Sequence, residues 1–297
     1  MTTTQSNFHI IGSGAVGSLL ALILAQNCHG VFFTDIRENS ESEKTIHLMG
    51  DLKRHFGDSK NFKYANSMRT QENVFLFSCI KYSGNFIPSL NLVLKEFSAT
   101  TPVLLLQNSY RHAQILRQSF ENPFIVGMLS DLEVFYQDSV LELSSLPFTL
   151  RIADCEQTTI DTLKNATKSP ILKFVSGENE KLVIWQKLAR WIPLSCITTI
   201  TMMNVGKALQ LFPRALLNDL VNEICTFAEN ETGHNFDTTL ILDQLNSLPR
   251  NLITSSMRDR QKNRSPEIQT VMSEIYQDLI EKNLSSIATL TTLKLLS

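Results

Sequence analysis

The chain has 297 residues, more than the roughly 100 to 200 residues of a usual single domain, so its length favours two domains. Its formal net charge of -2 gives no general attraction to nucleic acid or to an anionic membrane, so any anion-binding site has to be local. The five cysteines are scattered and form no CxxC pair. This indicates reduced thiols in a cytoplasmic protein and argues against a disulfide framework or a zinc site.

An apolar segment from Ala15 to Ala25 has the composition of a signal-peptide core. No basic residue precedes it, no small-residue cleavage site follows it, and it is too short to span a bilayer. We therefore expect a soluble protein that has no membrane segment.

Short apolar runs alternate with helical patterns in the first half of the chain. The runs are continuous in Val, Ile, Phe and Leu, as buried parallel strands require, and the alternation predicts a βαβ series. The expected strands are 8–12, 31–35, 73–79, 102–108 and 123–129, with a weaker one in "TIHLM", and the expected helices are 15–27, 85–97 and 110–119.

The pattern changes twice in the second half. The runs "LEVFYQD" and "VLELSSLPFTLRI", between residues 131 and 152, suggest antiparallel strands that close one edge of the sheet. From about residue 175 onward, helical spacing continues almost to the end of the chain. The sequence therefore predicts an α/β protein with a Rossmann-type dinucleotide-binding domain (1–176) followed by an all-helical domain (177–297).

A glycine-rich turn, "GSGAVG", follows the first predicted strand and opens the first predicted helix. In such a GxGxxG motif Gly12 makes the tight turn, Gly14 lets the backbone approach a pyrophosphate, and Gly17 lets the helix pack against the strand. Ala15 and Val16 begin the helix, where free N–H groups bind phosphates. This arrangement predicts a nicotinamide dinucleotide cofactor.

Two residues at the end of the second predicted strand and just beyond it bear on which dinucleotide binds. Asp35 stands where a carboxylate accepts the adenosine ribose hydroxyls of NAD, whereas Arg37 can pair with the 2'-phosphate of NADP. The two residues favour opposite cofactors, so the residues themselves leave NADP(H) and NAD(H) open.

Five motifs occur along the chain in a fixed order: "IGSGAVGSLLA", "FSCIKYSGN", "LLLQNSY", "WQKLARWIPL" and "ITSSMRDRQKNRSPEI". Together they resemble the ketopantoate reductase family, the 2-dehydropantoate 2-reductases, over nearly the whole chain. The resemblance implies a Rossmann domain and a helical domain with the active site in the cleft between them, and NADPH as the hydride donor.

Lys187 is the candidate general acid. It shares one helix face with Val183, Ile184 and Trp191, and an ammonium on an apolar face is desolvated, which lowers its pKa and prepares it to give up a proton. The alternative is a purely structural lysine whose stem packs on the apolar surface while its ammonium stays in solvent. The resemblance implies the catalytic role.

Four further residues are candidates mainly through the resemblance. For Glu267 it implies binding of the substrate hydroxyl and the lysine, although Ser265 as a cap and Pro266 at the first helical position offer a purely structural explanation. For Ser256 it implies contact with the substrate carboxylate, the alternative being an ordinary turn or cap. For Asn108, at a strand end, it implies a bridge between nicotinamide ribose and substrate, and for Lys81 a place in the cofactor cleft, where a solvated loop lysine is the alternative.

The chain also departs from the family pattern. Ser109 stands where the family has a glycine, and Trp191 and Ser195 stand where asparagines usually follow the lysine. A third asparagine is replaced by Ile253 or displaced to Asn251. These are substrate-pocket positions in the family, so the departures affect the identity of the 2-keto acid more than the hydride chemistry.

The sequence thus predicts NADPH-dependent reduction of 2-dehydropantoate to (R)-pantoate, a step of pantothenate and coenzyme A biosynthesis. One alternative is an NAD-dependent dehydrogenase of another small hydroxy acid. Another is a non-catalytic NAD(P)-sensing regulator, which has no need of Lys187 and Glu267. The six histidines show no metal-binding spacing, and both a monomer and a homodimer are compatible with the sequence.

Overall fold

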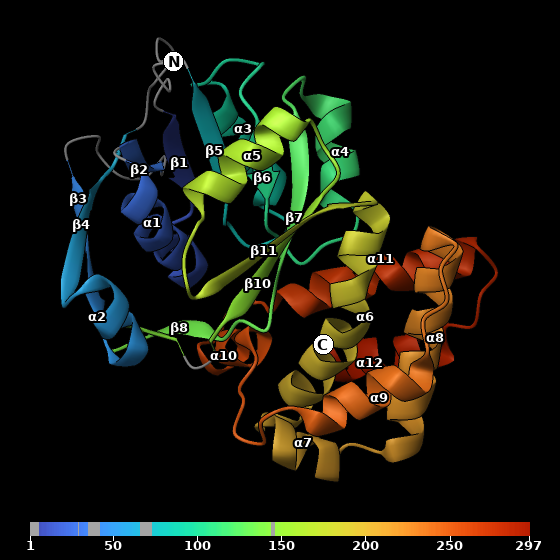
Figure 1. Ribbon diagram of the computed structural model, residues 1–297. Coiled ribbons are helices and arrows are strands. Elements are labelled where there is room, and N and C mark those ends of the chain that lie inside the picture. Colours follow the sequence, from blue (N-terminus) through green and yellow to red (C-terminus); the bar gives the residue numbers. More distant parts are fainter. Residues whose placement is uncertain (1–5, 29, 35–41, 66–72, 144–145) are drawn as a thin grey trace. The chain divides into compact units, whose positions relative to one another are not determined.

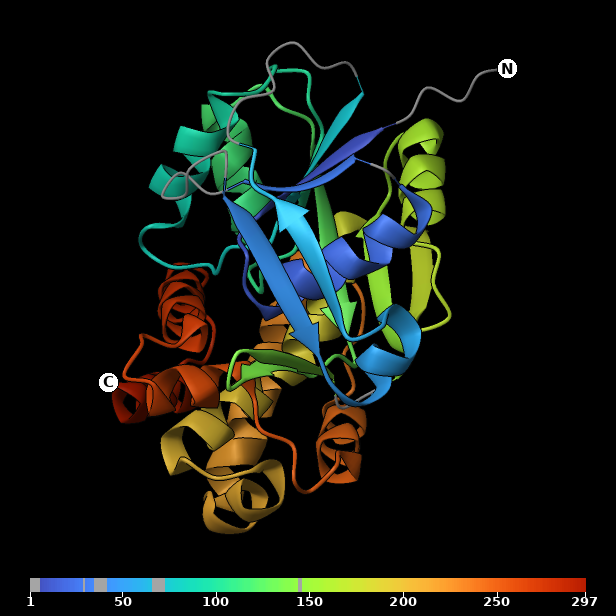
Figure 2. The same ribbon diagram turned by 90° about the vertical axis from the view of Figure 1, so that its left-hand side faces the viewer.

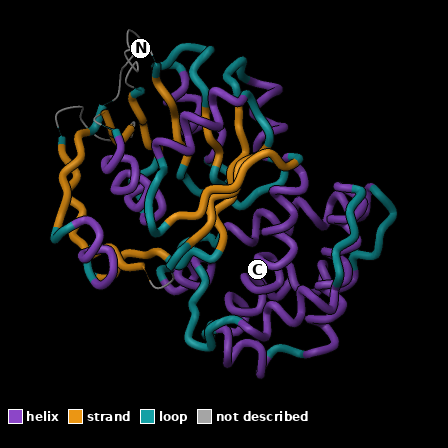
Figure 3. The backbone as a smooth tube through the Cα atoms, viewed as in Figure 1, coloured by secondary structure: helices purple, strands orange, loops and turns teal. Residues whose placement is uncertain are grey.

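The computed structural model describes residues 6–28, 30–34, 42–65, 73–143 and 146–297 (Figure 1). By its internal contacts the chain divides into two compact units, Met1–Val183 and Ile184–Ser297. Strands and helices mix in the first unit, whereas the second consists of helices and loops (Figure 3). The predicted fold class, a Rossmann-type α/β unit and an all-helical unit, is confirmed.

A seven-stranded sheet forms the centre of the first unit, in the order β11-β10-β7-β6-β5-β1-β2. All contacts between neighbours from β2 to β7 are parallel, as predicted from their continuous apolar runs. The strands are β1 (Asn7–Ile11), β2 (Gly30–Thr34), β5 (Val74–Ser78), β6 (Val103–Leu105), β7 (Phe124–Ser130), β10 (Phe148–Ala153) and β11 (Leu172–Glu178).

Helices cover both faces of this sheet. Helices α1 (Ala15–Asn27) and α5 (Gln157–Ala166) lie on one face, and α3 (Phe86–Leu94) and α4 (His112–Ser119) lie on the other (Figure 1). The middle of α1 is apolar all round, and the residues from Leu19 to Leu24 are at most 1% exposed. A helix buried on every side needs a second cover besides the sheet.

That cover is a four-stranded sheet with the order β4-β3-β9-β8, whose strand β8 packs against α1. Figure 2 shows its antiparallel hairpin of β3 and β4 in blue and light blue. The weaker strand candidate "TIHLM" is confirmed as part of β3. The elements are β3 (Glu43–Leu48), α2 (Gly50–Phe56), β4 (Ser59–Lys63), β8 (Val134–Gln137) and β9 (Val140–Leu143).

The strands after residue 131 were predicted to close an edge of the main sheet, and this was wrong for two of them. β8 and β9 do pair with each other in antiparallel fashion, but β9 joins β3 in the second sheet. β10 does pair antiparallel with β7, and β11 then adds in parallel at the outer edge. Local alternation identifies a strand but not its distant partner, which is why the assignment failed.

The second unit is built from seven helices: α6 (Glu180–Thr201), α7 (Val205–Leu211), α8 (Arg214–Thr232), α9 (Thr238–Ser247), α10 (Ser255–Gln261), α11 (Glu267–Glu281) and α12 (Ile287–Leu296). α6 begins two residues after β11 and runs across the point at which the contacts divide the chain. Within the unit, α12 packs against both α8 and α11.

A buried carboxylate ties α8 to the beginning of α12. Glu223 of α8 is 5% exposed and accepts hydrogen bonds from the backbone N–H groups of Ala288 and Thr289 at 3.1 and 2.8 Å. It also accepts from the hydroxyls of Ser285 and Thr289. Glu223 therefore caps α12 from another helix.

We expect Glu223→Ala to lower the free energy of unfolding by about 2 to 4 kcal/mol, because buried N–H groups and hydroxyls then lose a charged acceptor. Urea unfolding followed by circular dichroism measures the change. Asp219→Ala, at an exposed position of the same helix, is the control and should change stability by less than about 0.5 kcal/mol. Equal stability of the two variants would contradict the capping role.

Candidate active site

The glycine turn lies where the strand order of the main sheet reverses. β2 lies on one side of β1, and β5, the next strand of the sheet along the chain, lies on the other. In open α/β sheets, ligands bind at the carboxyl edge next to such a reversal. The turn from Gly12 to Gly17 occupies that edge, directly after β1.

Two of the three glycines are required by the surrounding backbone, and the third borders open space. Gly12 has φ +102°, and a Cβ there would lie 2.9 Å from the backbone nitrogen of Ile80. A Cβ on Gly17 would lie 2.1 Å from the carbonyl oxygen of Gly12, so α1 can approach the turn only through a glycine. Gly14 is exposed, and a Cβ there would meet nothing within 4 Å. Gly12 and Gly17 thus have the structural roles predicted from the motif, whereas the approach of Gly14 to a pyrophosphate stays a prediction.

The beginning of α1 suits an anion. Gly14 is its N-cap and makes no side-chain capping bond, and no acidic residue occupies the first turn that Ala15 and Val16 begin. The first N–H groups of a helix have no partners within the helix, and they attract negative charge. The open space at Gly14 and these N–H groups together fit the pyrophosphate of a dinucleotide.

Lys81 and Asn108 follow two neighbouring strands, β5 and β6, on one side of the strand β1 that leads into the turn. Lys81 is exposed and follows the close contact between Gly12 and Ile80. The buried amide of Gln107 donates to the carbonyl oxygens of Ser78 and Ile80, both at 2.9 Å, and so ties the end of β6 to the end of β5. This amide bridge, which the sequence reasoning missed, places half-buried Asn108 beside the same edge.

Ser109, which stands at a position where the resemblance leads one to expect glycine, has a local structural role. Its side chain is buried, and its hydroxyl accepts hydrogen bonds from the N–H groups of Arg111 and His112, both at 3.2 Å. The serine therefore supports the entry into α4. The two residues that bear on cofactor choice, Asp35 and Arg37, lie outside the described residues.

In the second unit, Lys187 lies on α6 and is half-buried. One turn before it are Val183 and Ile184, both nearly inaccessible, and one turn after it is the half-buried Trp191. The ammonium thus projects from a helix whose neighbouring positions are largely apolar. The lowered pKa expected for it stays a prediction.

A group of buried hydroxyls connects α6 with α10. The Oγ1 atoms of Thr198 and Thr254 are 2.7 Å apart, and Thr254 caps α10 by accepting from the N–H of Met257. The cap is therefore Thr254 and not Ser256. The hydroxyls of Ser195 and Ser256 are fully buried and have no hydrogen-bond partner among the described residues. Such groups are costly unless a ligand or water satisfies them.

Glu267 is the first residue of α11 and is 8% exposed. The expected helix start is corrected by one residue: Pro266 is the N-cap, with extended φ and ψ of -69° and 138°, and Ser265 is exposed and does not cap. A buried carboxylate at this position benefits from the positive end of the helix dipole. The structure thus places Lys187, Ser256 and Glu267 on three helices of one unit.

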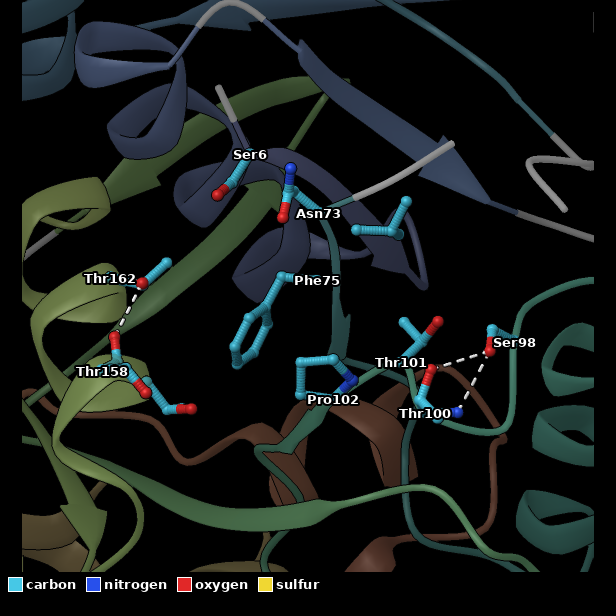
Figure 4. Close-up of a pocket in the computed structure, with 11 residues that line it drawn as sticks. Ser6, Asn73, Phe75, Ser98, Thr100, Thr101, Pro102, Thr158 and Thr162 are labelled. Carbon is cyan, nitrogen blue, oxygen red and sulfur yellow. Dashed lines mark hydrogen bonds between the residues drawn. The ribbon is translucent and has the colours of Figure 1, made fainter. Parts of the chain in front are cut away.

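A hydroxyl-lined recess of about 570 Å³ opens at the other edge of the main sheet (Figure 4). Ser6, Asn73 and Pro102, which line it, precede β1, β5 and β6, so it lies at the amino ends of these strands. None of its described lining residues is charged, and the hydroxyls of Ser98 and Thr162 bond to Thr100 and to their own helix. It is therefore separate from the glycine turn.

Three further features concern function. Within the described ranges, no three His, Cys, Asp or Glu side chains gather as they would around a metal ion. None of the helices that the structure describes has the length and apolar character needed to cross a membrane. All five cysteines are free thiols.

A glycine turn at the reversal point of a parallel sheet, followed by a helical unit, defines a dinucleotide-binding protein of the Rossmann class. The sequence profile of ketopantoate reductase PanE/ApbA matches residues 8–163, which is more than half of the chain. The chain belongs to this family, whose members are NAD(P)-dependent oxidoreductases that act on CH–OH groups. No curated protein matches the chain.

Solved structures share the fold over almost the full length. A dimeric ketopantoate reductase from Staphylococcus aureus is 20% identical, with a TM-score of 0.76 over 98% of this chain and 97% of that one. A probable 2-dehydropantoate 2-reductase from Bacillus subtilis is 15% identical, with a TM-score of 0.75 over 98% and 100%. D-mandelate dehydrogenase with NADH and anilino(oxo)acetate is 17% identical, with a TM-score of 0.78 over 98% and 97%.

Proposed function

We propose that the protein reduces a small 2-keto acid with NADPH, and that the substrate is 2-dehydropantoate and the product (R)-pantoate. The observation that carries the proposal is the family's glycine turn with its open Gly14 at the carboxyl edge of the sheet. Free thiols suit a cytoplasmic enzyme. Membership of an oxidoreductase family argues against the alternative of a non-catalytic regulator.

The reaction adds a hydride to C2 of the keto acid and a proton to its carbonyl oxygen. The bound nicotinamide supplies the hydride. Lys187 donates the proton to the oxygen as the C=O bond becomes C–O–H, a general-acid role. Glu267 binds the resulting hydroxyl and holds the ammonium, Ser256 offers its unpartnered hydroxyl to the substrate carboxylate, and Asn108 orients the substrate.

A second candidate function is oxidation or reduction of another small 2-hydroxy acid with NAD(H). Two observations favour it. D-mandelate dehydrogenase with NADH shares the fold, and the pocket asparagines of the family are replaced here by Trp191 and Ser195. An indole offers an apolar face and one N–H donor, so it suits a less polar substrate side chain than an asparagine does.

Initial-rate assays separate these functions. NADPH and NADH are each oxidised in the presence of 2-dehydropantoate, of the aromatic keto acid 2-oxo-2-phenylacetate, and of unbranched 2-keto acids. We expect the highest kcat/KM for NADPH with 2-dehydropantoate. A higher value for NADH with the aromatic acid would establish the second function, and no oxidation with any acid would reject both.

The cofactor preference depends on the opposing charges of Asp35 and Arg37. A bidentate contact between a guanidinium and the 2'-phosphate contributes about 1.5 to 3 kcal/mol, so Arg37→Ala should weaken NADPH binding by roughly tenfold or more. NADH binding should change little, and calorimetric titration of both cofactors measures the difference. A preference of the unmodified protein for NADH, relaxed by Asp35→Ala, would reverse the assignment.

A further inference from the structure

Lys44, on β3, reaches the glycine turn from the second sheet. Its ammonium donates a hydrogen bond to the carbonyl oxygen of Ser13, the residue between the first two glycines of the motif. No signal in the sequence connects the two residues, because they are 31 positions apart, Ser13 in the turn after β1 and Lys44 on a strand of the second sheet. Lys44 is therefore a candidate that only the structure reveals.

The ammonium contacts two aromatic rings. It is 5.3 Å from the ring centroid of Phe33 on β2 and 5.1 Å from that of Tyr136 on β8, both within the range of cation–π contacts. The ammonium therefore has two aromatic contacts in addition to its hydrogen bond to the Ser13 carbonyl. A cation held in this way keeps its direction toward the turn.

A second contact from the same sheet converges on the same carbonyl. The Tyr136 hydroxyl donates to Ser18 Oγ at 2.7 Å, and Ser18 Oγ donates to the Ser13 oxygen at 3.4 Å. The Ser13 carbonyl is thus held by Lys44 directly and by Tyr136 through Ser18. The four-stranded sheet therefore contacts the glycine turn at the Ser13–Gly14 peptide bond, directly through Lys44 and indirectly through Tyr136.

The orientation of that peptide matters for binding. A peptide bond is planar and trans, so its C=O and its N–H point in opposite directions. Because the Ser13 oxygen points toward Lys44, the Gly14 N–H points away from Lys44. Gly14 is the residue at which a Cβ would meet no protein atom within 4 Å. An ammonium on the carbonyl also polarises the peptide and strengthens its N–H as a donor.

We propose that Lys44 is a cofactor-positioning residue, whose ammonium fixes the Ser13–Gly14 peptide so that the Gly14 N–H donates to the pyrophosphate of the dinucleotide. This inference rests on the proposed dinucleotide-dependent function. It concerns the part of the cofactor that NADH, NADPH and ADP-ribose share. Loss of Lys44 therefore weakens all three ligands alike.

Calorimetric titration of the full-length protein with NADH, NADPH and ADP-ribose tests this. Lys44→Met keeps the apolar stem and removes the charge, and it should weaken all three ligands by about tenfold, the usual effect of losing one charged hydrogen bond. Lys44→Arg should stay within about threefold of the unmodified protein. Lys53→Met, which removes an exposed lysine paired with Asp58 on the same unit, is the control and should have no effect.

The pH dependence of binding by the unmodified protein gives a second readout. Burial lowers the pKa of Lys44 to about 8, so the unmodified protein should bind ADP-ribose most tightly below pH 8 and lose affinity as the pH rises to 9.5. Two titratable side chains lie at these ring contacts: Tyr136 contacts the ammonium itself, and Tyr64 contacts the ring of Phe33. Phenols ionise near pH 10, and burial raises the pKa of Tyr136 further.

Lys44→Arg should show no such decline, because guanidinium stays charged. Three results would overturn the inference: a Lys44→Met variant that binds as tightly as the unmodified protein, a loss confined to NADPH, or a pH profile identical in Lys44→Arg. The first would show that the contact between Lys44 and the Ser13 carbonyl oxygen does not contribute to cofactor binding. The second would show that Lys44 contacts the 2'-phosphate. If the unmodified protein binds none of the three ligands, the proposed function fails as well.

Discussion

Replacing Lys187 by alanine is expected to lower kcat for 2-keto acid reduction by roughly 100-fold or more, the usual contribution of a general acid. The forming alkoxide then takes its proton from water and not from a positioned ammonium. KM should change little, because this contact is strongest as the charge develops. Steady-state kinetics with NADPH measure both constants.

Lys181→Ala is the matched control, since Lys181 is an exposed lysine in the first turn of the same helix. It should leave kcat within about twofold of the unmodified enzyme, as surface substitutions usually do. Unchanged turnover in the Lys187 variant, with the control also unchanged, would remove Lys187 from the mechanism.

Substitutions at two glycines of the turn are expected to separate folding from binding. Gly17→Ala places a methyl group against the Gly12 carbonyl oxygen, so α1 must move away from β1. Overpacking of this kind costs about 1 to 3 kcal/mol, and the displaced helix start should weaken dinucleotide binding by about 100-fold or more. Both the melting temperature and the affinity should fall.

Gly14→Ala should weaken cofactor binding without lowering stability. The methyl group meets no protein atom within 4 Å, so the melting temperature should be unchanged. It fills the space that the pyrophosphate needs, so NADPH affinity should fall by about tenfold or more. Differential scanning fluorimetry with and without NADPH distinguishes the two variants. Normal cofactor binding by Gly14→Ala would show that the pyrophosphate lies elsewhere.

The central strands and the glycine turn could be predicted because their signals are local. Five continuous apolar runs define buried strands without reference to any other part of the chain, and the three glycines are within six residues of one another. The spacing of turn, helix and second strand then fixes a Rossmann arrangement. The helical character of the second unit follows from sustained periodicity in the same way.

The elements missed from the sequence have weak or non-local signals. β4 (Ser59–Lys63) contains one apolar residue, Phe62, and is recognisable as a strand only through its pairing with β3. α5 is short and rich in Thr, a residue with low helix propensity, and its buried stripe is limited to Ile160, Leu163 and Ala166. The pairing of β9 with β3 connects segments that lie far apart in the sequence.

The same division applies to the site. Gly12 and Gly17 are predictable because backbone sterics requires glycine at these two points, and Gly14 is recognised as a member of the same short motif although the protein leaves room for a Cβ there. The unpartnered hydroxyl of Ser256 and the contact between Lys44 and Ser13 arise from packing between remote segments, so no local pattern reports them. The candidate residues on helices, such as Lys187 and Glu267, could be proposed from family motifs. Their burial and their contacts depend on the packing of the whole fold and could not be predicted from the sequence.

Transfer of a labelled hydride tests the central claim most directly. The protein is incubated with 2-dehydropantoate and NADPH that carries deuterium at both C4 positions of the nicotinamide, and the product is analysed by mass spectrometry and NMR. We predict pantoate with one deuterium, bound to C2, formed by the unmodified enzyme and at a rate at least about 100-fold lower by Lys187→Ala. Binding of NADPH without any deuterated product, from this keto acid or another, would contradict the account.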